Sequence, residues 1–230
     1  MKKRTKTEVR IRNILSDILL TSIKEPLSYS ILHSLKVICE RNLCTGKVDV
    51  RDIQRCIDWE SVSRDSCFLS LFCVSPEGMV ELREEFKGYG SYICSRVKSY
   101  WRFLSKELQT NKEFSGDELK KGILLFNSGF YFECHEFLED LWKRSEGREK
   151  EFLKGLIHAC VAFYHLEYEN QKGALGYLKR SYNNLKGFIP VFWGIDVKDF
   201  TRGLLSCVEV LKGSSKAKEQ LVVPKLKVFS

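Results

Sequence analysis

The chain has 230 residues, of which 43% are hydrophobic and 30% charged, and its formal net charge is +8 at pH 7. This composition is typical of a globular protein with enough apolar side chains for a core. No run of ~18 uncharged apolar residues occurs, so we expect no membrane-spanning helix. Arg10, Arg12 and Asp17 interrupt the apolar stretch after the basic start, so we expect no secretion signal.

The chain contains nine cysteines, and none of them forms a C-x-x-C pair. Most lie within apolar periodic stretches, where a thiol packs as a small hydrophobic group. Buried, reduced thiols are usual in the cytoplasm. We therefore expect a cytoplasmic protein.

A cluster of cations opens the chain. It suits contact with phosphates of a nucleic acid or with an acidic partner. It is equally typical of a solvated basic tail. Nucleic acid therefore stays open as a partner, and so does a second copy of the chain. The cluster consists of Lys2, Lys3, Arg4, Lys6, Arg10 and Arg12.

Hydrophobic spacing predicts helices over 7–24 and 28–42, and a short helix after Asp49. Residues 61–74 fit either a buried helix or a strand. Ser75 followed by Pro76 predicts the start of another helix, which ends at Gly88, and a longer helix follows to about residue 108. Two short helices followed by VSPEG also resemble a winged-helix module, although the space before VSPEG looks too short for a wing.

The polar segment 111–118 is the best candidate for a domain boundary. We expect a mainly helical N-terminal region over 1–114 and a second domain over 115–212. The second domain should hold four helices over about 117–145, 149–169, 171–187 and 196–212. Residues 213–230 read as a basic C-terminal tail. The expected fold is all-α, with an antiparallel helical bundle in the C-terminal half.

The segment FNSGFYFECHEFLEDLW, residues 126–142, carries the polar groups of greatest interest. With a rotation of about 100° per residue, Tyr131, His135 and Trp142 lie on the side of the helix opposite Glu133. Glu139 falls beside them and Glu136 flanks them. This placement predicts that His135 and Glu139 point inward, whereas Glu133 and Asp140 are solvated.

The following helix, 149–169, is apolar almost all round, apart from one stripe that contains Lys154, His158 and His165. A short connection near Gly147 predicts that this helix runs antiparallel to the preceding one. Counting outward from that connection brings His158 close to the level of His135 and Glu139. We therefore expect a buried cluster of histidine and glutamate side chains between the two helices.

Three interpretations of this cluster stay open. In the first, His135, Glu139, His158 and His165 hold a divalent metal ion, and Glu136 or Glu139 is the catalytic base of a hydrolase. In the second, the cluster is a hydrogen-bonded network that fixes the packing of the helices. In the third, it performs acid–base chemistry without a metal. Tyr131, Trp142 and Lys154 surround it in each case.

The combined motif over about 117–212 resembles a helical family known as domain of unknown function 309. The resemblance implies a helical bundle, often labelled a predicted metal-dependent hydrolase. Lys154 and His158 stand where that family usually has glutamine, and an ammonium group there disfavours a neighbouring cation. The matching residues are Phe126, Asn127, Gly129, Tyr131, Phe132, Glu133, His135, Glu136, Glu139, Trp142, Phe152, Leu153, Gly155, Leu156, Ile157, His165, Asn170, Gly173, Ala174 and Leu178.

A non-catalytic function is the alternative to hydrolysis. Small residues at helical spacing in GALGYLKRSYNNL resemble tetratricopeptide helices, although no 34-residue repeat occurs. The basic N-terminal half could then contact a protein or nucleic-acid partner. The sequence thus predicts either a metal-dependent hydrolase or an interaction or regulatory protein.

Overall fold

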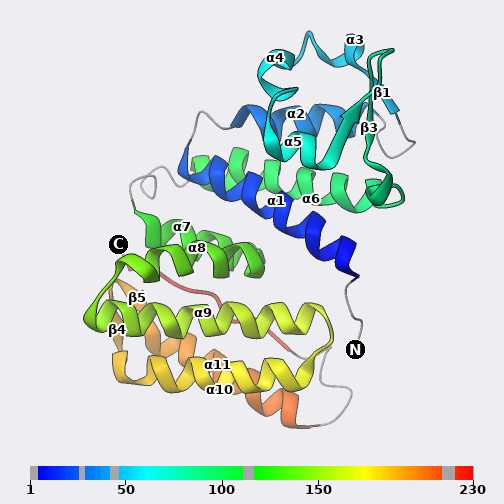
Figure 1. Cartoon of the computed structure of the whole chain (residues 1–230). Helices are drawn as coiled ribbons and strands as arrows, with labels where there is room; N and C mark the ends of the chain where they lie inside the picture. The colour runs from blue at the N-terminus through cyan, green and yellow to red at the C-terminus, as the bar shows by residue number, and fades with distance from the viewer. Residues whose placement is uncertain (1–4, 26–28, 42–46, 111–116, 214–220, 230) are drawn as a thin grey trace. The chain divides into compact units, whose positions relative to one another are not determined.

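A computed structural model describes residues 5–25, 29–41, 47–110, 117–213 and 221–229. The chain forms two compact units (Figure 1). Arg4–Asn111 make up the N-terminal unit, and the C-terminal unit contains Lys112–Ser230. Helices dominate both units, and the described strands are only two to four residues long. The predicted all-α class is confirmed.

The N-terminal unit is built on three long helices. They are α1 (Lys6–Lys24), α2 (Tyr29–Glu40) and α6 (Gly90–Arg102), which is followed by a π-helical stretch over Phe103–Leu108. Thr5 starts α1 with a capping box, because its hydroxyl accepts from the Glu8 amide and the Glu8 carboxylate accepts from the Thr5 amide. The apolar face of α1 packs against α2 and α6.

A small antiparallel sheet covers part of these helices. It has the order β1-β3-β2, with β1 over Lys47–Asp49, β2 over Phe72–Val74 and β3 over Met79–Leu82. Three short helices separate β1 from β2, namely α3 (Val50–Ile53), α4 (Trp59–Val62) and α5 (Ser66–Leu71). The unit thus runs from helices through one strand and three short helices into a hairpin, and β2 follows α5 without a linker.

The predicted helix after Ser75 is wrong. Ser75 to Gly78 form the turn of the β2–β3 hairpin, in which Gly78 has a φ of +82° and donates its amide to the Ser75 carbonyl. Serine followed by proline suits a helix start and a turn equally well. The turn forms because β3 pairs with both β1 and β2. Between β3 and Gly88 the chain forms only a short 3-10 helix over Glu84–Phe86.

The C-terminal unit is a helical bundle. Within it α9 packs between α8 and α10, while α7 packs on α8 and α11 on α10 (Figure 1). A 3-10 turn over Lys186–Phe188 and a hairpin of β4 (Val191–Phe192) and β5 (Ile195–Asp196) connect α10 to α11. The helices are α7 (Glu118–Asn127), α8 (Tyr131–Arg144), α9 (Gly147–Glu167), α10 (Gln171–Leu185) and α11 (Val197–Gly213).

The single helix expected over 117–145 is two helices. Gly129 has a φ of +81°, a left-handed conformation that glycine adopts at little cost. The amide of Phe130 returns to the carbonyl of Leu125 over this turn. The chain therefore changes direction between α7 and α8, and residues of α7 cannot be placed on the helical wheel of α8.

The end of the chain packs on the bundle, so residues 221–229 are not simply a basic tail. Asn127 accepts from the amide of Leu226 and donates to its carbonyl, both at 2.9 Å. Val228 forms a β-bridge with Ile195, and Lys227 pairs with Asp199 at 2.7 Å. Asn127, one of the residues on which the family resemblance rests, thus anchors the C-terminal segment beside the α7–α8 turn.

Candidate functional site

The face of α8 that packs into the bundle is not the predicted one. Glu133 is only 1% exposed, although we expected it to be solvated. His135 and Glu139, expected to be buried, are half-exposed. Both expectations are wrong. The buried side of α8 consists of Glu133, Cys134, Phe137 and Leu138.

The predicted inward face was defined by the aromatic rings of Tyr131 and Trp142, and both side chains are only half-buried at the edge of the contact. Cys134 and Phe137 fall about 100° and 40° from Glu133 on the wheel of α8 itself, so they define an apolar stripe that includes this glutamate. A helical wheel of α8 that included Cys134 and Phe137 would have indicated the buried face.

Three polar side chains of α8 meet on its half-exposed side. Nδ1 of His135 lies 3.3 Å from a carboxylate oxygen of Glu136, and Nε2 lies 3.1 Å from one of Glu139. The imidazole is 23% exposed, and the two carboxylates are 43% and 41% exposed. An ion pair in such a position contributes no more than ~1 kcal/mol to stability. The group is thus accessible to solutes.

His158 and His165 contact α10 and not α8. The side-chain amide nitrogen of Asn184 lies 3.1 Å from Nδ1 of His158, and that of Asn170 lies 3.0 Å from Nδ1 of His165. An amide nitrogen only donates, so both imidazoles are neutral and carry their proton on Nε2. The centre of the Tyr177 ring lies 5.6 Å from the ring centre of His158 and 5.5 Å from that of His165.

The predicted metal ligands do not form one centre. His135 and Glu139 pair with each other on α8. His158 bonds to Asn184 on α10, and His165 bonds to Asn170, the N-cap of α10. Within the described ranges, no three His, Cys, Asp or Glu side chains gather closely enough to hold a metal ion. Helix α9 packs with one side on α8 and with another on α10, and the two histidines bond on the α10 side. Metal binding by His135 with Glu139 stays a prediction.

The other residues expected around the cluster are dispersed. The ring of Tyr131 packs against Phe126 and Phe163, and burial, with Glu167 nearby, raises the pKa of its hydroxyl to about 12. Trp142 lies under the ammonium group of Lys150, 4.6 Å from its ring centre. Lys154 is exposed on α9 near His158.

These helices carry the likeness to known proteins. The family model described as "Domain of unknown function (DUF309)" matches residues 119–177, from α7 into α10. The resemblance predicted from the sequence is confirmed over this segment. A curated relative, "Uncharacterized protein YpuF" of Bacillus subtilis (strain 168), is 44% identical over 45 residues, which are 19% of this chain. The match spans 26% of that relative, about a quarter of its length.

A pair of thiols lies inside the DUF309 segment. Sγ of Cys160 is 3.2 Å from Sγ of Cys134, which in turn lies 3.2 Å from the carbonyl oxygen of Gly122. Burial raises the pKa of the Cys134 thiol well above its usual value, and the bond to Cys160 raises it further. The Cys134 thiol is therefore a protonated packing group.

Three residues hold the histidines of the DUF309 segment, namely Asn170, Tyr177 and Asn184. The sequence singled out Asn170 only as a match to the family, and it did not indicate Tyr177 or Asn184. Asn170 also caps α10, because its side chain accepts from the Gly173 amide at 3.0 Å, and this N-x-x-G spacing is a recognisable signal. Tyr177 and Asn184 are two turns apart on α10, so a helical wheel of α10 would have placed them together.

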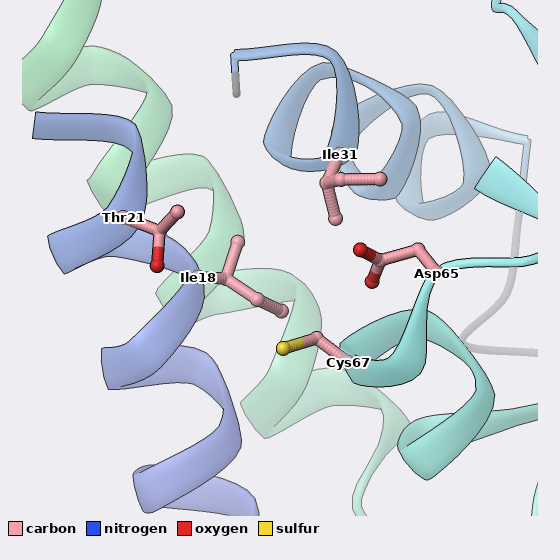
Figure 2. A pocket seen from close by; sticks show the side chains of 5 residues that line it. All are labelled: Ile18, Thr21, Ile31, Asp65 and Cys67. Atoms are coloured by element: carbon pink, nitrogen blue, oxygen red, sulfur yellow. The ribbon is translucent and has the colours of Figure 1, made fainter. Parts of the chain in front are cut away.

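The N-terminal unit has a small pocket, and neither of the predicted catalytic residues lines it (Figure 2). Ile18, Thr21, Ile31, Asp65 and Cys67 line it. Burial raises the pKa of the Cys67 thiol, and the negative charges of Asp65 and Asp17 act in the same direction. Cys67 is thus a poor nucleophile at neutral pH.

No helix of the described residues has the length and apolar character needed to cross a bilayer. The expected absence of such a helix is confirmed for that part of the chain. His33, the remaining histidine, packs its ring 5.1 Å from that of Trp101 within the N-terminal unit.

Proposed function

We propose that the protein is a non-catalytic regulatory protein that binds a protein partner through its winged-helix-like N-terminal unit. The charge of the surface around α5 and the β2–β3 hairpin carries this proposal. In helix-turn-helix proteins the second helix of the motif enters the major groove of DNA, and Lys and Arg side chains bind the phosphates. In this protein the corresponding segment carries more carboxylates than Lys and Arg side chains.

Residues 47–87, from β1 through the hairpin, contain nine carboxylates and six Lys or Arg side chains. Helix α5 itself has no cationic residue. Four cations of the segment are also paired with its carboxylates, namely Lys47 with Glu81, Arg51 with Asp49, Arg64 with Glu60 and Lys87 with Glu84. Phosphates would be repelled by such a surface. The carboxylates are Asp49, Asp52, Asp58, Glu60, Asp65, Glu77, Glu81, Glu84 and Glu85.

Apolar side chains complete this surface. Leu69 on α5 is 38% exposed and Val74 on β2 is 39% exposed. Apolar side chains amid carboxylates suit a protein partner with a cationic, partly apolar face. We name α5 together with β2 and β3 the helix–hairpin surface.

Site-specific photo-crosslinking tests the partner class. A photoreactive amino acid replaces Leu69 in the full-length protein, and the control carries it at Leu205, a 40% exposed leucine on α11. We expect a discrete crosslinked product from position 69 in extracts of the producing cells, resistant to nuclease and absent after Val74→Asp. Equal products at both positions, or a product that nuclease removes, would contradict the proposal.

A second measurement addresses nucleic acid directly. Fluorescence anisotropy of a labelled DNA duplex with the full-length protein should show no binding that depends on the helix–hairpin surface. Any weak binding at low salt should be the same for wild type and for an Arg64→Gln, Arg83→Gln variant. Binding that falls steeply with salt and is lost in this variant would assign the surface to DNA.

Metal-dependent hydrolysis is the second candidate function. The accessible contact of His135 with Glu136 and Glu139 favours it, because imidazole and carboxylate groups on one helix face can share a divalent cation. Under the proposed function, protein purified without an affinity tag should carry no stoichiometric metal. One equivalent of zinc or manganese that is lost in His135→Ala, but kept in the His33→Ala control, would support the hydrolase instead.

A further inference from the structure

A cationic cluster lies where α9 meets α10. His158 is half-buried there and is held by Asn184, while the exposed ammonium group of Lys154 is one turn away on α9. The guanidinium carbon of Arg180 on α10 lies 5.1 Å from the centre of the Tyr177 ring, whose centre is 5.6 Å from that of His158. Tyr177 thus holds Arg180 and His158 on the same side of the helix pair.

No carboxylate compensates this charge. Neither Lys154 nor Arg180 forms an ion pair with any acidic residue that the structure describes, including Glu151, one turn before Lys154. Helix α10 contains Lys172, Lys179 and Arg180 and no acidic residue at all. Burial lowers the pKa of His158, and the positive charges of Lys154 and Arg180 lower it further.

The imidazole donor of this cluster is fixed by the packing. Asn184 occupies Nδ1 of His158, so the ring presents Nε2–H as its hydrogen-bond donor. Gly155 lets the two helices approach closely, and the buried hydroxyl of Ser181 donates to the Gly155 carbonyl at 2.8 Å. The α9–α10 contact thus fixes the imidazole, with Lys154 one turn before it on α9 and Arg180 against the Tyr177 ring on α10.

We infer that Lys154, His158 and Arg180 form a binding site for the phosphate group of a small phosphorylated molecule. A guanidinium donates two parallel hydrogen bonds to an oxyanion, and Lys adds a point charge. Together with the imidazole N–H, the two cations match the nearly double negative charge and the three terminal oxygens of a phosphate monoester better than the single charge of a carboxylate. This site is separate from the helix–hairpin surface, and its test does not depend on the proposed function.

Nuclear magnetic resonance titration of the isotope-labelled full-length protein tests the site. The probes are inorganic phosphate, acetate at equal ionic strength, and a six-nucleotide RNA without terminal phosphate. We expect phosphate to shift the ring signals of His158 and the amide signals of Gly155 and Asn184, and acetate to leave them in place. Lys154→Gln with Arg180→Gln should weaken phosphate binding about tenfold or more.

The control variant is Lys179→Gln, which removes an exposed cation of α10 beside Arg180 and should keep wild-type binding. All three substituted side chains are exposed, so the unfolding temperature should not change and lost binding cannot reflect misfolding. The inference fails if phosphate shifts no signal, if acetate binds as well, or if Lys179→Gln weakens binding equally. RNA that shifts these signals at a lower concentration than phosphate would assign the site to nucleic acid instead.

Discussion

Phe126→Ala should lower the free energy of unfolding of the C-terminal unit by about 3–5 kcal/mol, the usual range for removing a fully buried phenylalanine. Phe126 on α7 is 1% exposed. Its ring centre lies 5.4 Å from that of Tyr131 on α8, 5.7 Å from Phe163 on α9 and 5.5 Å from Phe200 on α11. Truncation leaves a cavity where four helices meet.

Urea denaturation of the full-length protein measures this loss. A background with Trp59→Phe and Trp101→Phe leaves only Trp142 and Trp193, so that fluorescence reports on the C-terminal unit. The matched control is Phe229→Ala, which removes an exposed ring of the same unit and should change stability by no more than about 0.5 kcal/mol. Equal effects of the two substitutions would show that Phe126 is not central to the core.

Gly155→Ala should destabilise the same unit by about 1–3 kcal/mol, because it overpacks the α9–α10 contact. A Cβ atom at this position would lie 2.6 Å from both Cγ and Cδ2 of Leu185 and 3.3 Å from Cβ of Asn184. Leu185 is fully buried and cannot rotate away. The clash outweighs the gain of about 1 kcal/mol that alanine otherwise brings to a helix interior.

Gly176→Ala is the control for Gly155→Ala. Gly176 is an exposed glycine within α10, and nothing lies within 4 Å of a Cβ built there. Alanine should therefore stabilise the unit by about 0.5–1 kcal/mol. A double-mutant cycle with Leu185→Ala tests the mechanism, since Leu185→Ala should cost less stability in the Gly155→Ala background than alone. Additive effects would show that Leu185 is not the group that clashes.

The helix–hairpin surface shows the limit of local patterns in the N-terminal unit. Residues 61–74 were ambiguous between helix and strand, and they contain both, α5 followed directly by β2. Ser75 and Pro76 suit the first turn of a helix as well as a tight turn. Strand pairing with β1, about 30 residues earlier in the chain, selects the turn, and hydrophobic spacing within a short window does not report such pairing.

In the C-terminal unit, the sequence by itself determined the DUF309 likeness and the helices after Gly147, because apolar periodicity over 15 to 21 residues is a strong local signal. It did not separate α7 from α8. Only the tertiary structure decided which side of each helix meets which neighbour. Packing of α8 against α7 and α9 buried Glu133 and left His135 half-buried. The close approach at Gly155 turned His158 toward Asn184, because a helix surrounded by others can satisfy its polar groups on any side.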